Sequence, residues 1–215
     1  MVELIRVLVV DDHPVVLGGF VTALSAAEGI ELVGQATSVA EATALIASQR
    51  VDVALVDLRL PDGSGLEILV AAEKVPDPPA FLIISSFETP QYVDAAIRMG
   101  AGGFLLKTAP LELVVDAIRR IAAGGTAFTV NQLRGARQHP WEPLTAREAA
   151  VVGGVMAGRS NDELSADLGI SKKTVEAYLT RLYERHDVST RVELAVKASR
   201  EGWLELPPNG RPTRT

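Results

Sequence analysis

Short apolar runs alternate with longer amphipathic segments along the first 124 residues of the chain. The runs are rich in β-branched residues and predict strands, while the longer segments predict helices. Five strand–helix units in succession predict a five-stranded, doubly wound parallel sheet with helices on both faces. We expect strands near residues 4–10, 31–35, 52–57, 81–85 and 103–106, and helices near 14–27, 38–49, 64–74, 90–99 and 110–123.

The strand signal ends near Gly124, and a different pattern follows it. Glycine and proline interrupt residues 125–142, which predicts a linker in which 131–137 could form a short helix. Four helical segments come next, at 145–157, 160–168, 171–186 and 190–200. We therefore expect an α/β domain at 1–124, a linker at 125–142, an all-α four-helix domain at 143–206 and a flexible tail at 207–215.

Two glycine pairs conflict with the predicted helices. Gly18-Gly19 lies inside the first helix of the α/β half, and Gly153-Gly154 lies inside the first helix of the all-α half. A glycine inside a helix costs about 1 kcal/mol relative to alanine. We expect tertiary packing to offset this cost at Gly153-Gly154.

Composition limits the partners of each half. With 47% hydrophobic residues among 215, the chain can bury a core in each of two domains. The part up to residue 130 carries 8 basic and 16 acidic side chains, a net charge of −8, whereas the rest carries 13 and 11, a net +2. The first part therefore suits a cation site, and the second permits nucleic-acid binding.

Composition also limits the compartment. The chain has no cysteine, which excludes disulfides and thiolate metal sites. Its apolar runs are too short to cross a bilayer, and its N-terminus lacks the basic segment and long apolar stretch of a signal peptide. We expect a cytoplasmic protein without a membrane partner.

Charged residues follow three of the predicted strands. Asp11-Asp12 comes after the first strand, Asp57 after the third and Lys107 after the fifth. Parallel strands end at one edge of their sheet, so these side chains should converge in one crevice. Three carboxylates there repel one another unless a cation such as Mg²⁺ binds them, and one oxygen of Asp57 would remain free to attack phosphorus. Taken singly, an aspartate after a strand is most often a helix cap, and a lysine there is most often a solvated strand end.

The motifs around these residues carry a family resemblance. The stretches VLVVDDHPVV, ALVDLRLPDGSG, FLIISS and GGFLLK together resemble the receiver domain of bacterial response regulators, across about residues 4–123. The resemblance implies a flavodoxin-like fold and phosphorylation of Asp57 by a sensor histidine kinase. It implies a metal ion held by Asp12 and Asp57 directly, by Asp11 through water and by the backbone carbonyl of Arg59, with Lys107 at the phosphoryl group.

The same resemblance implies a switch. In this family a hydroxyl at the end of the fourth strand reaches toward the phosphoryl group, and an aromatic side chain in the fifth strand rotates inward behind it. Ser85 and Phe104 occupy those positions. An ordinary core aromatic is the alternative for Phe104. His13 is expected to be a loop or helix-start residue, and no metal role is assigned to His13, His139 or His186.

The second half contains a helix-turn-helix pattern. Ser160 with Glu163 predicts a capping box, Gly169 ends that helix, and Ser171 caps the next. In such a unit the second helix enters the major groove of DNA. The stretch from LTAREAAVV to STRVELAV resembles the LuxR-type four-helix domain across about residues 143–203, and its combination with a receiver is the NarL/FixJ class of response regulator.

That class implies contacts with double-stranded DNA, and a homodimer when the protein is phosphorylated or bound to DNA. Asp187 stands where the class often has glycine, but aspartate tolerates the left-handed backbone of such a turn. By position, the residues that would touch bases are Glu176, Ala177 and Thr180, and those that would touch phosphates are Lys172, Lys173, Thr174, Arg181 and Arg191.

Three other functions compete with this interpretation. A phosphatase-like enzyme could use Asp57 as nucleophile, but Leu58-Arg59 stand where a second acid would follow it. A nucleotide-binding fold would need a glycine-rich phosphate loop, which Asp11-Asp12 and the two residues after it do not provide. A receiver with a helical half that binds only protein is the third. We expect no enzymatic activity beyond phosphorylation and dephosphorylation of the protein itself.

Overall fold

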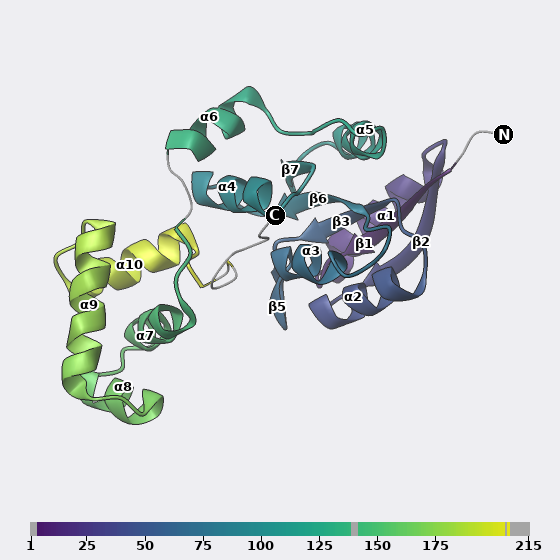
Figure 1. Cartoon of the computed structure of the whole chain (residues 1–215). Helices are drawn as coiled ribbons and strands as arrows, with labels where there is room; N and C mark the ends of the chain where they lie inside the picture. The colour runs from purple at the N-terminus through teal and green to yellow at the C-terminus, as the bar shows by residue number, and fades with distance from the viewer. Residues whose placement is uncertain (1–3, 139–141, 205, 207–215) are drawn as a thin grey trace. The chain divides into compact units, whose positions relative to one another are not determined.

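The computed structural model describes residues 4–138, 142–204 and 206 (Figure 1). They form two compact units, with the boundary before Glu142. The tail expected at 207–215 lies outside the described residues, as does His139.

A five-stranded parallel sheet forms the centre of the first unit, as predicted. Its strands stand in the order β2-β1-β3-β6-β7. All five lie within two residues of the expected positions, because each is a short apolar run bounded by polar or turn residues. The bounds are β1 (Ile5–Val10), β2 (Ile30–Ala36), β3 (Val53–Asp57), β6 (Ala80–Ser85) and β7 (Gly103–Leu106).

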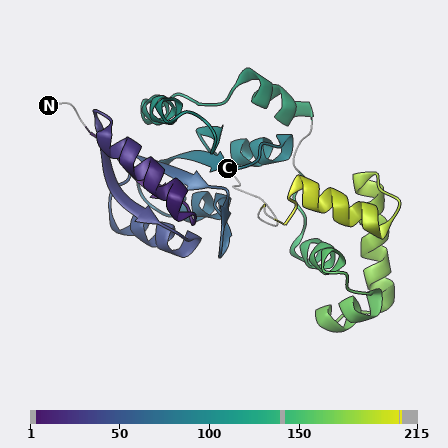
Figure 2. The same ribbon diagram turned by 180° about the vertical axis from the view of Figure 1, so that it is seen from behind.

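Five helices cover the two faces of this sheet (Figures 1 and 2). Phe20 and Leu24 of α1 pack with Ile118 of α5 against the strand residues Val9 and Leu55. Helices α2, α3 and α4 lie on the opposite face. The helices are α1 (Pro14–Ala26), α2 (Val39–Ser48), α3 (Leu66–Ala72), α4 (Pro90–Arg98) and α5 (Leu111–Ala122).

A small hairpin that sequence reasoning did not predict follows β3. It pairs β4 (Arg59–Leu60) with β5 (Gly63–Ser64) in an antiparallel arrangement. Two-residue strands are too short to give a periodicity signal. The hairpin delays the start of α3 by two residues relative to the expected helix at 64–74.

The segment expected to act as linker contains helix α6 (Val130–Gln138). This helix packs on α4 and belongs to the first unit. Its buried side chains are Gln132 and Ala136. The part of the chain that separates the two units is therefore shorter than the linker expected at 125–142.

The second unit contains four helices, as predicted. Val151 of α7, Leu164 of α8, Leu182 of α9 and Leu194 of α10 meet in a hydrophobic core that Trp203 closes. This core is separate from that of the first unit. The helices are α7 (Ala146–Met156), α8 (Asn161–Leu168), α9 (Lys172–His186) and α10 (Arg191–Glu201).

Packing explains one glycine of the second pair, Gly154, whereas a Cβ on Gly153 would make only an ordinary contact with Leu204. A Cβ atom on Gly154 would lie 2.1 Å from Cδ2 of the buried Leu164, so glycine is what lets α7 approach α8 this closely. At Gly18 and Gly19 a Cβ would meet nothing within 4 Å. Nothing in the structure explains that pair.

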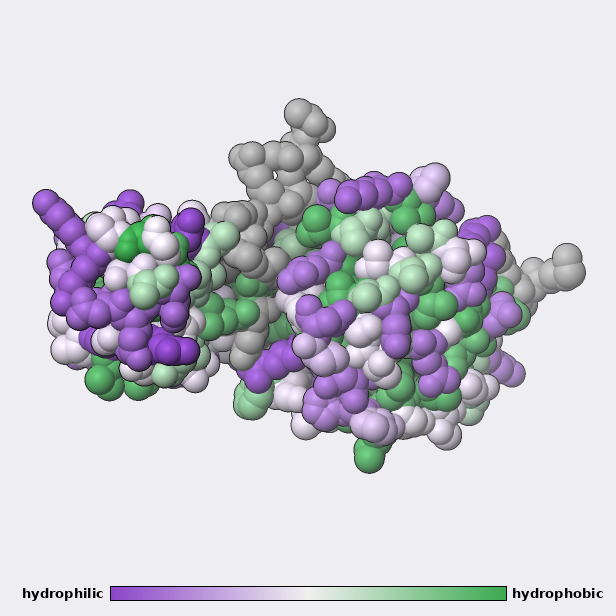
Figure 3. Space-filling model, turned by 90° about the horizontal axis from the view of Figure 1, so that it is seen from below, coloured by the Kyte–Doolittle hydropathy of each residue, from purple (hydrophilic) through white to green (hydrophobic). Residues whose placement is uncertain are grey.

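On the face drawn in Figure 3, hydrophobic residues appear as patches among hydrophilic ones. None of the helices in the described ranges is long and apolar enough to span a bilayer.

Candidate functional site

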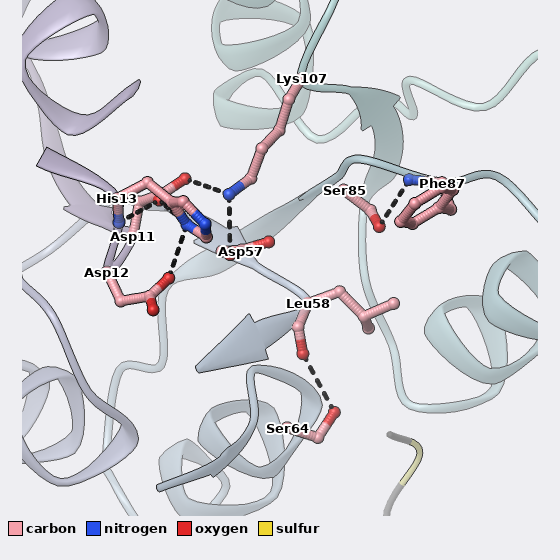
Figure 4. A network of polar contacts seen from close by, with 9 residues as sticks. All are labelled: Asp11, Asp12, His13, Asp57, Leu58, Ser64, Ser85, Phe87 and Lys107. Atoms are coloured by element: carbon pink, nitrogen blue, oxygen red, sulfur yellow. Dashed lines mark hydrogen bonds and ion pairs between the residues drawn. The ribbon is translucent and has the colours of Figure 1, made fainter. Parts of the chain in front are cut away.

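The polar residues predicted to converge do so at one edge of the sheet (Figure 4). Asp57 is the last residue of β3 and Ser85 the last of β6, while Asp11 follows β1 and Lys107 follows β7. These four strands are parallel neighbours in the sheet, so their C-terminal ends lie side by side. Residues up to 96 positions apart in the sequence thus share one pocket.

Lys107 joins two carboxylates in this pocket. Its Nζ lies 2.7 Å from Oδ2 of Asp11 and donates a hydrogen bond to Oδ2 of Asp57 at 2.8 Å. Burial opposes the charged form of Lys107, but the hydrogen bonds and charges of the two carboxylates outweigh it and raise the pKa of the lysine. The ammonium therefore stays charged and partly neutralises the acidic pocket.

The Asp57 carboxyl is almost fully buried, at 2% exposure. Burial raises its pKa above the usual value, and the nearby charge of Asp11 adds to this effect. Lys107 and the backbone amide of Arg59 act in the opposite direction, because they hydrogen-bond the charged form. The result is a poorly solvated carboxylate, which is ready to react with an electrophile held in front of it.

The donor set of the pocket fits a hard divalent cation. One ligand atom each from Asp11, Asp12, His13 and Asp57 lies within 4.8 Å of all the others. Oδ2 of Asp11 and Oδ1 of Asp12 are buried. Oδ2 of Asp11 pairs with the Lys107 ammonium at 2.7 Å, and Oδ1 of Asp12 lies 2.8 Å from Nδ1 of His13. Carboxylate oxygens are hard ligands of the kind that Mg²⁺ prefers.

His13 was expected to be a loop or helix-start residue, and it directly precedes α1. Its backbone amide donates to Oδ1 of Asp11 at 2.8 Å, which fixes the orientation of that carboxylate. Its Nδ1 also lies 2.8 Å from Oδ1 of Asp12. The proximity of the ring to the acidic pocket was not predicted, and the only signal in the sequence was its adjacency to Asp12.

The hairpin begins at Arg59, two residues after the phosphoacceptor candidate Asp57. The Arg59 guanidinium donates to Oη of Tyr92 at 3.2 Å and lies 5.0 Å from the ring centroid of Phe87. Its backbone carbonyl as a metal ligand stays a prediction. Sequence reasoning missed Gly65, where a Cβ would lie 2.0 Å from the backbone oxygen of Asp57. Only glycine permits that approach, and the DGSG motif was its signal.

The proposed switch residues are both buried. Oγ of Ser85 accepts a hydrogen bond from the backbone amide of Phe87 at 3.2 Å, and the serine is 1% exposed. Phe104 is fully buried, so its ring already lies in the protein interior. Its backbone carbonyl accepts a hydrogen bond from the side chain of Gln132 on α6. The switching role of these two residues stays a prediction.

The helix pair α8 and α9 has the predicted boundaries. Ser160 and Glu163 form the capping box that opens α8, and Gly169 ends it with φ 63°. Ser171 then accepts from the amide of Thr174 and caps α9. Asp187 closes α9 in the left-handed conformation with φ 49°, as expected for a residue in the place of a glycine.

The candidate DNA contacts on α9 lie on one accessible face. Lys172, Lys173, Glu176, Ala177, Thr180 and Arg181 are exposed, and Thr174 is half-buried. Lys172 forms an ion pair with Asp162 at 3.0 Å, and the Arg181 guanidinium lies 4.7 Å from the ring centroid of Tyr178. Both cations stay accessible, because these partners are surface groups.

Arg191 differs from the other phosphate-contact candidates. Its guanidinium donates to Oδ1 of Asn161 at 3.0 Å and to the backbone carbonyl of Arg159. These bonds tie the start of α10 to the start of α8. A phosphate contact by Arg191 stays a prediction. The guanidinium would have to make that contact while it keeps its hydrogen bonds to Asn161 and Arg159.

Comparison with known proteins assigns each unit separately. Residues 7–119 match the response regulator receiver domain family, and residues 142–198 match the bacterial regulatory proteins of the luxR family. The receiver match alone covers more than half of the chain. The two matches correspond to the two compact units, so the order of domains along the chain agrees with the sequence analysis.

Relatives with both domains match almost the whole chain. The probable transcriptional regulatory protein NarL of Mycobacterium tuberculosis H37Rv is 34% identical over 210 residues, 94% of this chain and 97% of that protein. The DNA-binding transcriptional activator DevR/DosR of the same strain is 34% identical over 206 residues, 91% of this chain and 94% of that protein.

A solved structure extends the likeness to three dimensions. The response regulator ChrA, from a heme-sensing two-component system, has a TM-score of 0.53 and 28% identity, covering 94% of this chain and 99% of that one. The residues around Asp57, the helix-turn-helix of the second unit and the full-length relatives all indicate the same protein family. The chain belongs to the two-component response regulators that join a receiver domain to a LuxR-type helix-turn-helix domain.

Proposed function

We propose that Asp57 is a transient phosphate carrier and that its phosphorylation controls DNA binding by the second unit. The observation that carries this proposal is the buried Asp57 carboxylate with Lys107 2.8 Å away. A free oxygen of Asp57 attacks phosphorus in a phosphohistidine of a sensor histidine kinase. The new P–O bond replaces the P–N bond, and the leaving imidazole takes up a proton.

The residues around Asp57 have separate roles in this transfer. Asp11, Asp12, Asp57 and the Arg59 carbonyl would hold Mg²⁺, which supplies positive charge against the phosphoryl oxygens when it is bound. Lys107 would turn from Asp57 to a phosphoryl oxygen while it keeps Asp11 as its partner. Ser85 would release the Phe87 amide and donate its hydroxyl hydrogen to another phosphoryl oxygen.

The second unit would supply the output. Helix α9 would enter the major groove of double-stranded DNA, with Glu176, Ala177 and Thr180 at the bases. Lys172, Lys173, Thr174, Arg181 and Arg191 would hold phosphates. The 34% identity to a DNA-binding transcriptional activator supports this assignment. The exposed Val192 and Val196 on α10 offer apolar surface for a homodimer on DNA.

This proposal places the protein in the cytoplasm, where kinase and DNA are both accessible. It includes no turnover of an external substrate, because the only phosphoryl acceptor is the protein's own Asp57. Phosphorylation from a donor and loss of the phosphoryl group to water are then the only reactions.

Labelling with a small phosphodonor tests the first half of the proposal. Asp57→Asn should abolish Mg²⁺-dependent phosphorylation by acetyl phosphate, measured as a mass increase of the intact protein. Asp77→Asn, which makes the same change at an exposed loop position, should leave the labelling unchanged. Undiminished labelling of the Asp57→Asn variant would show that another residue is the acceptor.

Genomic DNA enrichment tests the second half. The purified full-length chain should enrich a defined DNA motif more strongly with beryllofluoride and Mg²⁺ than without them. Asp57→Asn should remove the difference between the two conditions. No enriched motif in either condition would favour a helical half that binds only protein.

A further inference from the structure

A buried polar side chain connects α6 to the switch region. Gln132 is 6% exposed, and neither the phosphoacceptor pocket nor the DNA-binding helix uses it. Its Nε2 donates to Oε2 of Glu88 at 2.7 Å and to the backbone carbonyl of Phe104 at 3.2 Å. Its Oε1 accepts from the backbone amide of Thr129 at 2.8 Å. Every polar atom of this amide is therefore engaged.

Both partners of the Nε2 atom belong to the proposed switch region: Glu88 is close to Ser85 in the sequence, and Phe104 is itself a switch residue. Glu88 lies in the loop that follows β6, three residues after Ser85, and Phe104 lies in β7. The same loop is tethered to Ser85 through the hydrogen bond from the Phe87 amide. When the Ser85 hydroxyl turns toward Asp57, its oxygen leaves the Phe87 amide, and the loop loses that tether.

The loop then cannot move without consequences for α6. A shift of Glu88 removes one acceptor from a buried amide, and an unsatisfied buried donor costs more than the bond itself contributed. Helix α6 must therefore follow the loop or lose the contact. It is also the last helix of the first unit before the chain enters the second unit.

We propose that Gln132 is a latch that holds the resting arrangement of the loop after β6 and of β7, and that couples their movement to α6. This inference rests on the proposed function, because it requires that Ser85 respond to a phosphoryl group on Asp57. The latch opposes activation. Weakening it should therefore make the activated state easier to reach, and the affinity for an activating ligand should rise.

The test is the affinity of the full-length chain for beryllofluoride in the presence of Mg²⁺. Fluorine NMR measures this affinity. Gln132→Glu replaces the donor amide by a carboxylate facing Glu88, and it should tighten beryllofluoride binding by about tenfold. Asn131→Asp makes the same chemical change at the neighbouring exposed position of α6 and should leave the affinity within about twofold of the wild type. A side chain that merely stabilised the fold would weaken the binding or leave it unchanged.

Exchanging the side chains of Glu88 and Gln132 should restore the wild-type affinity for beryllofluoride. Glu88→Gln combined with Gln132→Glu restores one donor and one acceptor with their positions reversed, and the affinity should return toward the wild-type value. Glu88→Gln alone changes only an exposed loop residue and should tighten binding by about threefold, which keeps the test valid if Gln132→Glu does not fold.

Three results would overturn the latch. They are unchanged or weaker beryllofluoride binding in both single variants, a double variant that behaves like the worse single one, and a wild type that binds no beryllofluoride at all. The last result would also remove the proposed function, whereas the first two would leave Asp57 as phosphoacceptor intact.

Discussion

At the scale of single residues, burial of the charged Asp57 side chain lowers the free energy of unfolding of the first unit. Asp57 is buried beside Asp11, and one ammonium group, that of Lys107, serves both carboxylates. Burial raises the pKa of Asp57, which means that the folded chain holds the charged carboxylate less favourably than the unfolded chain does. This desolvation therefore lowers stability in the absence of a metal ion.

Removal of this charge should stabilise the first unit. A carboxyl whose pKa is raised by folding favours the folded state most at low pH, and this contribution is lost as the pH rises from about 4 through the folded-state pKa. At pH 7 and without Mg²⁺, Asp57→Asn should raise the free energy of unfolding by about 1 kcal/mol. Urea unfolding in EDTA, followed by circular dichroism, measures this.

Asp52 provides the opposite control. Its Oδ2 accepts from the backbone amide of Arg6 at 2.8 Å and from Nε of Arg6 at 3.1 Å. Burial acts to raise its pKa, but these hydrogen bonds outweigh it and lower the pKa. Asp52→Asn should therefore destabilise the same unit at pH 7. If both substitutions changed stability in the same direction, desolvation of Asp57 would not be the cause.

At the scale of elements, identical substitutions should have opposite effects in two helices. Gly154→Ala in α7 places a methyl group against the buried Leu164, and it should lower the free energy of unfolding of the second unit by about 1–2 kcal/mol. Gly18→Ala in α1 meets open space and should stabilise the first unit by up to about 1 kcal/mol, because alanine has the higher helix propensity. Thermal unfolding of both variants provides the comparison.

On the exposed face of α9, some side chains should set the preferred DNA sequence and others should set the affinity for DNA of any sequence. Glu176→Ala and Thr180→Ala should change the preferred DNA motif, since their side chains would face base edges. Lys172→Ala should weaken binding to all sequences and reduce the salt dependence of binding, because a phosphate contact releases counterions. Motif selection and salt titration distinguish these outcomes, and an unchanged motif in the first two variants would rule out the proposed base contacts.

At the scale of the whole molecule, two separate cores allow each unit to respond to pH in its own way. His186, at the end of α9, stacks on Trp203 with 3.9 Å between ring centroids, and its Nε2 accepts from Nε of Arg185 at 3.2 Å. Burial, with the neighbouring positive charges of Arg185 and Lys197, lowers the pKa of His186 to about 4. Folding of the second unit therefore favours the neutral imidazole.

The second unit should consequently lose stability in mild acid. Because the folded-state pKa of His186 lies below the usual histidine value of 6.5, its contribution is complete above pH 6.5 and is lost as the pH falls toward 4. The loss at pH 5 should be about 1–2 kcal/mol, allowing for partial exposure of the ring. Fluorescence of Trp203 in a Trp141→Phe background follows this unit during urea unfolding, and His186→Gln should flatten its pH dependence, whereas His13→Gln in the other unit should not.

The sequence by itself determined the element order, both fold classes and most of the site. Apolar runs of fixed period specify strands and helices locally, and parallel strands necessarily end at one edge, which brings Asp11, Asp57 and Lys107 together. Helix caps are equally local, so the boundaries at Ser160 and Gly169 could be predicted from residue type alone, whereas the turn at Asp187 was expected from the family resemblance.

Only the tertiary structure decided features that depend on distant neighbours. The approach of α7 to α8 at Gly154 and the close contact of Gly65 with Asp57 are packing distances, which no local pattern contains. The bonds from Gln132 to Glu88 and Phe104 join residues 44 and 28 positions apart. Such contacts depend on how α6 folds back onto α4, and this is why a segment with the composition of a linker became part of the first unit.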